Sequence, residues 1–158
     1  MKGYPGWFLA AVLGTLLLMF VSGCVLAPTT LVMRFDTDVP WRLPTDGRVL
    51  VAAMHAAAGF LAVMLLGSLW TVHMRSNWRR KRQRASGATL GVLLLLLAAS
   101  AVAIYYAGDG DLGAAASLLH LGAGLAFAVP FGWHWAHARR AASSSLGATA
   151  PPAEAHRT

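Results

Sequence analysis

Residues 49–69 read VLVAAMHAAAGFLAVMLLGSL, a stretch without any Asp, Glu, Lys or Arg. A bilayer core about 30 Å thick is crossed by about 20 apolar residues in a helix, which is the length of this stretch. Three further stretches are just as apolar and uncharged: 7–26, 90–107 and 112–138. None of them alternates apolar with polar residues as a membrane β-strand does. The sequence therefore predicts an all-α integral membrane bundle of four helices.

The predicted helices cover about residues 7–26, 47–74, 88–107 and 112–137, in one domain that spans 1–140. Residues 28–48 contain Pro28, Pro40 and Pro44, and they are predicted to form the longest loop because proline disfavours a regular helix. The segment 141–158 is rich in Ala, Ser and Pro and is predicted to be a disordered cytoplasmic tail. Charged residues make up only 12% of the chain, about half the share in a soluble domain, which also indicates a membrane protein.

The distribution of charge predicts the orientation. Six of the thirteen Lys and Arg residues fall within residues 75–84, between the second and third predicted helices. Basic loops of this kind stay on the cytoplasmic side of the membrane. Both termini are therefore predicted to be cytoplasmic (N-in/C-in), in a multi-pass protein of the bacterial inner membrane. The basic residues are explained by topology or lipid contact, so no nucleic-acid partner is predicted. Five of the six acidic residues fall in the two loops predicted outside: Asp36, Asp38, Asp46, Asp109 and Asp111.

The chain has one cysteine, Cys24. This excludes an internal disulfide and the C-x-x-C-H attachment of a c-type haem, so a haem would have to be held by coordination and packing. Cys24 follows Val21, Ser22 and Gly23, which together look like a lipoprotein cleavage site. Two interpretations stay open: the first helix is retained, or it is cleaved and Cys24 carries lipid.

Five of the six histidines lie in or at the ends of the second and fourth predicted helices: His55, His73, His120, His134 and His137. An ionisable residue in a membrane span usually faces the bundle interior and is a candidate functional residue. His55 and His73 are eighteen residues apart, which is five helical turns and places both on one face. His120 and His134 are fourteen apart, about 40° from eclipsed. Because the two helices run in the same direction, His55 and His120 are predicted to lie at one depth near the outer side.

Two histidines that face each other across a bundle can bind a haem iron, with one imidazole on each axial face. The sequence thus predicts two haem b groups, the outer one on His55 and His120 and the inner one on His73 with His137 or His134. His137 is predicted to lie closer to the membrane depth of His73, whereas His134 lies closer to the helix face that carries His120. The alternative is that each histidine hydrogen-bonds a neighbouring helix or lies at the interface.

The second and fourth helices also align with each other without a gap. Placing His55 on His120 brings Gly59 onto Gly124, and these glycines would let a porphyrin approach the backbone. Both glycines are therefore predicted to contact the cofactor.

These two-histidine helices resemble the four-helix di-haem b-type cytochromes, which include the b561-like group, hydrogenase b-type subunits and uncharacterised relatives. Residues 73–78, HMRSNW, are similar to the H-x-x-x-N-W that closes a helix in one such group, and Ser22-Gly23 resembles a Thr-Gly near the end of the first helix. The resemblance covers about residues 7–140. It implies a quinone as a possible small partner and other redox subunits of a membrane complex as protein partners. Two departures are the first helix, which has no histidine, and the eighteen-residue spacing on the second, where fourteen is common.

The favoured function is electron transfer across the bilayer, as a subunit of a respiratory or quinone-linked complex. A superoxide:quinone oxidoreductase-like enzyme is a second class, but the outer Arg34, Arg42 and Arg48 are offset by three aspartates and would attract an anion weakly. A metal transporter is a third class, although such proteins usually add membrane carboxylates or thiols. A haem-free structural or assembly subunit is the fourth.

Overall fold

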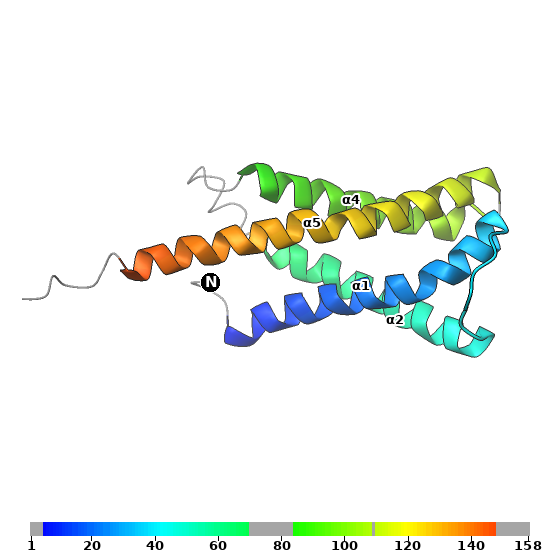
Figure 1. Cartoon of the computed structure of the whole chain (residues 1–158), viewed down its shortest axis with the longest axis horizontal. Helices are drawn as coiled ribbons and strands as arrows, with labels where there is room; N and C mark the ends of the chain where they lie inside the picture. Colours follow the sequence, from blue (N-terminus) through cyan, green and yellow to red (C-terminus); the bar gives the residue numbers. More distant parts are fainter. Residues whose placement is uncertain (1–4, 70–83, 109, 148–158) are drawn as a thin grey trace, which may run out of the picture.

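The computed structural model describes residues 5–69, 84–108 and 110–147. It contains four helices: α1 Gly6–Phe35, α2 Thr45–Leu69, α4 Arg84–Tyr106 and α5 Asp111–Gly147. All four are long and apolar enough to cross a membrane. They run alternately back and forth along one axis, so α1 begins and α5 ends at the same end of the molecule (Figure 1). The predicted all-α membrane bundle of four helices is confirmed.

The helix boundaries differ from the prediction at the end of α1. This helix was expected to end near Leu26 before a loop over residues 28–48, but it continues through Pro28 to Phe35. Proline inside a membrane helix removes one backbone donor and is tolerated where neighbouring helices and hydroxyls compensate. The carbonyl that Pro28 leaves without its helical donor is that of Cys24, four residues earlier. The helix ends at Asp36, whose φ of 47° is left-handed, so the connection to α2 is only residues 36–44.

The other helix ends also differ. The segment 141–158 was expected to be disordered, but α5 continues to Gly147, since the alanines after Arg140 are strong helix formers. Residues 148–158 lie outside the described residues. The second predicted helix reached residue 74, and α2 is described only to Leu69, so His73 cannot be placed.

The helices pack as two antiparallel hairpins, α1 with α2 and α4 with α5, and α1 also contacts α5. The buried side of α1 carries one residue in every seven: Phe8, Thr15, Ser22 and Thr29. Apart from Phe8, the buried side chains among the described residues are small: on the other helices they are Ala58, Ala62, Ser100, Ala116, Ser117 and Ala123. Small residues let membrane helices approach closely, since lipid offers no hydrophobic drive for large apolar side chains to turn inward.

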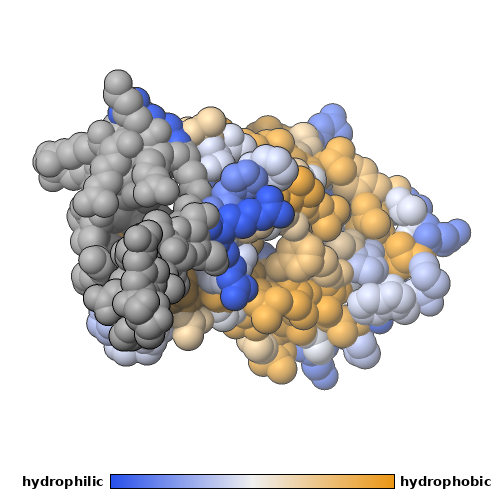
Figure 2. All heavy atoms as spheres, turned by 60° about the vertical axis from the view of Figure 1, so that its left-hand side comes forward, coloured by the Kyte–Doolittle hydropathy of each residue, from blue (hydrophilic) through white to orange (hydrophobic). Residues whose placement is uncertain are grey.

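Large apolar side chains point outward. Phe60 is 76% exposed, Leu95 72% and Val129 77%. Figure 2 shows the resulting hydrophobic surface around the middle of the molecule, with hydrophilic residues toward its far end. This arrangement of small residues inside and large apolar ones outside is that of a protein surrounded by lipid. The cavity described next therefore lies within a membrane-embedded bundle.

The α4–α5 turn is tied to α1 at the end of the molecule away from the termini. Gly108 adopts a φ of +67°, which glycine accepts without strain, and its carbonyl accepts a 3.0 Å hydrogen bond from Nη1 of Arg34. The same carbonyl lies where a Cβ on Gly113 would have to be. Glycine at 113 therefore allows the turn to close over the start of α5.

Candidate functional site

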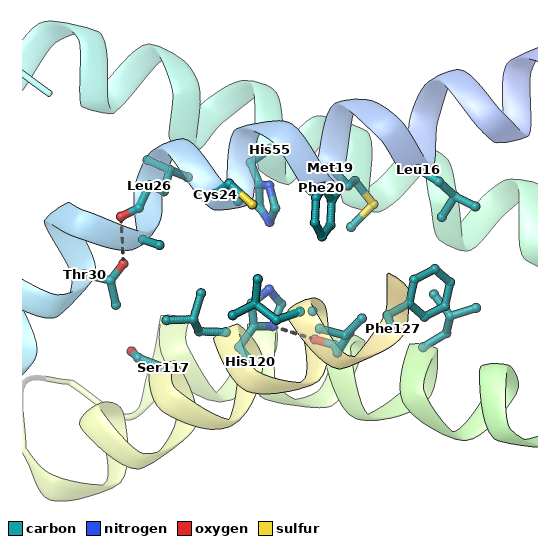
Figure 3. Close-up of a pocket in the computed structure, with 17 residues that line it drawn as sticks. Leu16, Met19, Phe20, Cys24, Leu26, Thr30, His55, Ser117, His120 and Phe127 are labelled. Atoms are coloured by element: carbon teal, nitrogen blue, oxygen red, sulfur yellow. Dashed lines mark hydrogen bonds between the residues drawn. The ribbon is translucent and has the colours of Figure 1, made fainter. Parts of the chain in front are cut away.

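The imidazoles of His55 and His120 meet in the space between the two hairpins. His55 comes from α2 and His120 from α5, and their ring centres are 6.1 Å apart with planes at 76°. Figure 3 shows the two rings pointing toward one another across a cavity, each from its own hairpin. The prediction that these two histidines lie at one depth and face each other is confirmed.

The Nδ1 atom of His55 is held by a serine of the neighbouring helix. Ser22 Oγ on α1 lies 2.8 Å from this nitrogen. The Ser22 hydroxyl donates its own proton to the Leu18 carbonyl at 2.6 Å, so it accepts from Nδ1–H of His55. A neutral imidazole has one N–H and one lone pair, and the lone pair of His55 is therefore on Nε2.

His120 is held in the same way by α4. Its Nδ1 lies 3.1 Å from the Leu97 carbonyl oxygen, which can only accept, and 2.9 Å from Oγ of Ser100. The Ser100 hydroxyl donates to the same Leu97 carbonyl at 3.1 Å. Nδ1 of His120 therefore carries the proton, and its lone pair is also on Nε2. Both histidines present the nitrogen that can bind a metal.

The cavity between the hairpins has a volume of about 190 Å³. Apolar side chains from α1, α4 and α5 form most of its wall, among them Leu16, Met19, Phe20, Leu97, Leu121 and Phe127. The polar groups on the wall are the two imidazoles, Cys24, Thr30 and Ser117, and no Asp, Glu, Lys or Arg is among the described lining residues. Such a wall suits an apolar ligand fixed by a few polar contacts.

Gly59 and Gly124, the two glycines that were predicted to contact the cofactor, differ in their distance from the cavity. Gly124, predicted to contact the cofactor, lines the cavity. Gly59 is not among the lining residues, and a Cβ there would meet only the end of Met19 at 3.9 Å. Gly23, which was not predicted, also lines the cavity, and a Cβ on it would lie 3.3 Å from Cε1 of His55. The close approach of α1 to the His55 ring therefore depends on Gly23.

The two candidate inner ligands on α5, His134 and His137, have different neighbours. His134 Nδ1 lies 2.9 Å from Oγ of Ser86, which α4 supplies. His137 donates from Nδ1 to the Trp133 carbonyl of its own helix, at 3.1 Å, and its ring centre is 4.4 Å from that of Trp133. Their predicted partner His73 lies outside the described residues, so the inner pairing remains a prediction.

Three serines contact the histidines, and the histidine spacing does not reveal them. Ser22 belongs to the sequence that looks like a cleavage site and to the family resemblance, whereas nothing in the sequence pattern points to Ser86. A signal for Ser100 does exist, since it is the one Ser or Thr within the apolar run 90–107. Pairing that hydroxyl with a histidine requires the register between α4 and α5, which only the structure gives.

Comparisons of the chain with protein-family models, with curated proteins and with solved structures found no match.

Proposed function

We propose that this chain is a membrane b-type cytochrome in which His55 and His120 bind one haem iron from opposite sides. The observation that carries the proposal is the opposed pair of imidazoles, with both Nδ1 atoms engaged and both Nε2 lone pairs available. An imidazole nitrogen binds a transition metal at about 2 Å, and roughly 1 Å more separates that nitrogen from its ring centre. Two imidazoles on one metal therefore have ring centres about 6 Å apart, close to the observed 6.1 Å.

The apolar wall favours a porphyrin over a hydrated cation. A cation in transit needs carboxylate, carbonyl or water oxygens, or thiolates. Among the described residues, no group of three or more His, Cys, Asp or Glu side chains is placed to hold a metal ion. A bis-imidazole site completed by a porphyrin needs no further protein ligand, so two histidines suffice.

The cavity has to widen to admit a porphyrin. Its volume of about 190 Å³ is below the about 300–1,000 Å³ that organic ligands usually occupy. Met19, Leu97 and Leu121 are flexible side chains on the wall and can turn aside. The two hairpins meet mainly through α1 and α5, and a small separation of these helices enlarges the space between the histidines.

Haem supplies one-electron chemistry, and the chain would supply binding, orientation and shielding from water. A second haem on His134 or His137 with His73 would lie nearer the cytoplasmic side, about 21 Å along α5 from His120 in the case of His134. The two sites together would give electrons a route across the bilayer. Exchange with a quinone or with redox subunits of a membrane complex belongs to this proposal as the expected source and sink of electrons.

The test is a visible spectrum of the full-length chain, purified in detergent from haem-replete cells, before and after reduction with dithionite. We expect low-spin b-type bands and two haems per chain in the pyridine haemochrome assay. His55→Ala and His120→Ala should each remove the same haem. Thr89→Ala is the control, because Thr89 is not among the lining residues and its hydroxyl donates only within its own helix, to Ala85.

Two results would overturn the proposal. One is a folded wild-type protein, monodisperse by size exclusion, that contains no haem and takes up none when haem is added. The other is a His55→Ala or His120→Ala variant that keeps both haems in the low-spin state. Either result would favour a haem-free structural or assembly role.

A further inference from the structure

The same serine–histidine contact occurs three times in the described part of the bundle. Ser22 on α1 holds Nδ1 of His55 on α2, and Ser100 on α4 holds Nδ1 of His120 on α5. Ser86 on α4 contacts Nδ1 of His134 on α5 in the same manner, at 2.9 Å. In each case the serine comes from the first helix of a hairpin and the histidine from the second.

His137 does not follow this pattern. Its Nδ1 donates to a carbonyl of its own helix, and its ring packs on Trp133, one turn away. It is also turned about 100° around α5 from His120 at 3.6 residues per turn, whereas His134 is turned only about 40°. Within α5, His134 is therefore the residue whose position and Nδ1 contact repeat those of His120.

A hydrogen bond to Nδ1 has a defined effect on a metal-binding histidine. It fixes the tautomer and the ring orientation, and it makes Nε2 more basic. The effect is strong where the contact is shielded from water, and Ser22 and Ser100 are 5% and 4% exposed. A serine on a neighbouring helix also couples the ring orientation to the packing of the hairpin, which an acceptor on the same helix does not do.

We propose that Ser22, Ser100 and Ser86 are the positioning residues of the haem-binding histidines, and that the Ser86 contact assigns the second haem to His134 and not to His137. The inference rests on the proposed haem-binding function. It adds three residues to the site and selects one of the two inner candidates. Ser22 and Ser100 act on the two ligands of the first haem, and Ser86 acts on a ligand of the second.

The experiment replaces each serine by alanine in the full-length chain. We expect Ser22→Ala to weaken binding of the first haem about tenfold or more, as loss of a second partner of a metal-bound histidine commonly does. Ser100→Ala should weaken it less, because the Leu97 carbonyl still accepts from Nδ1 of His120. The reduction potential of that haem should rise, because a less basic imidazole stabilises the oxidised iron less. Ser86→Ala should change the second haem in the same way and leave the first unchanged.

Two controls match these variants. Thr37→Ala removes an exposed hydroxyl outside the cavity that bonds the carbonyl of Phe35, and Thr89→Ala removes a hydroxyl one turn from Ser86 that bonds only the carbonyl of Ala85. Neither control should change haem affinity or potential. Ser22→Thr, Ser86→Thr and Ser100→Thr keep the hydroxyl and should retain the wild-type potential, which separates the hydrogen bond from a general packing effect.

The measurements are haem transfer to an excess of an apo haem-binding protein and a spectroelectrochemical titration of each variant. His134→Ala should lose the second haem, and His137→Ala should keep two. If the wild type binds haem but the serine variants behave like the two controls, the positioning role is wrong while the proposed function stands. If His137→Ala loses a haem and His134→Ala does not, the assignment of the second site is wrong. A wild type without haem instead rejects the proposed function itself.

Discussion

Oγ of Ser22 lies 2.8 Å from Nδ1 of His55, so a hydroxyl on α1 determines which nitrogen of an α2 imidazole carries the proton. Ser22 and Gly23 also belong to the sequence that looks like a lipoprotein cleavage site. In the fold both residues position His55, because Ser22 hydrogen-bonds its imidazole and Gly23 leaves room for the ring. The first helix thus contributes to histidine geometry without providing a ligand of its own.

Gly23 offers a direct test of this contact. In Gly23→Val, the added side chain would press on the His55 ring, since even a Cβ at this position lies 3.3 Å from Cε1. We expect the ring to rotate, the Ser22 hydrogen bond to weaken and the first haem to become high-spin or be lost. Overpacking of this kind typically costs about 1–3 kcal/mol of stability. The measurement is the visible spectrum of the reduced protein together with its haem content.

Gly14→Val is the matched control on the same helix, because a Cβ at Gly14 meets no atom within 4 Å. It should keep both haems in the low-spin state. If Gly23→Val and Gly14→Val give the same spectrum, α1 does not restrict the His55 ring.

Features of the fold that depend on a single physical property, such as hydrophobicity, could be predicted from the sequence. Uncharged apolar runs of membrane length predicted four helices, and the shared direction of the second and fourth helices predicted that His55 and His120 lie at one depth and face each other. The predicted end of α1 near Leu26 is wrong, because Pro28 does not break the helix in this bundle. Inside a membrane bundle the cost of ending a helix early is larger, since freed backbone groups find no water.

The details of the site depend on contacts between helices that periodicity cannot supply. The order of residue types along one helix does not tell which hydroxyl of α4 reaches His120 or His134, since that needs the relative register of two helices. Gly59 was expected at the cavity from its alignment with Gly124, but the two hairpins are not exact copies and Gly23 lines the cavity instead. The inner pairing stays a prediction, because His73 lies outside the described residues.

The turn between α4 and α5 should be sensitive to a single methyl group. A Cβ at Gly113 would overlap the backbone oxygen of Gly108, and Gly113→Ala should therefore open the turn and lower stability by about 1–3 kcal/mol. Gly122→Ala lies in the same helix, meets nothing within 4 Å and should be neutral or slightly stabilising. Thermal unfolding followed by circular dichroism in detergent measures both. Equal midpoints for the two variants would contradict the tight turn.

Membrane orientation can be tested independently of haem. A topology reporter inserted at residue 40, in the connection between α1 and α2, should read periplasmic, and one at the C-terminus should read cytoplasmic. The physical reason is the concentration of Lys and Arg in residues 75–84 and of Asp in the loops at the other end. A cytoplasmic signal from residue 40 would invert the bundle and exchange the outer and inner sites.

The final prediction concerns the tautomers of the histidines in the haem-free protein. At a pH where the imidazoles are neutral, His55 and His120 should both carry their proton on Nδ1, because Ser22 and the Leu97 carbonyl accept it. Nitrogen-15 NMR of protein labelled at histidine distinguishes the two tautomers by the shift of the unprotonated nitrogen, and single histidine variants assign the signals. In Ser22→Ala, His55 should become a mixture of tautomers while His120 stays unchanged. A proton on Nε2 of either ring in the wild type would leave that nitrogen unable to bind a metal without first losing the proton, and it would contradict the preorganised site.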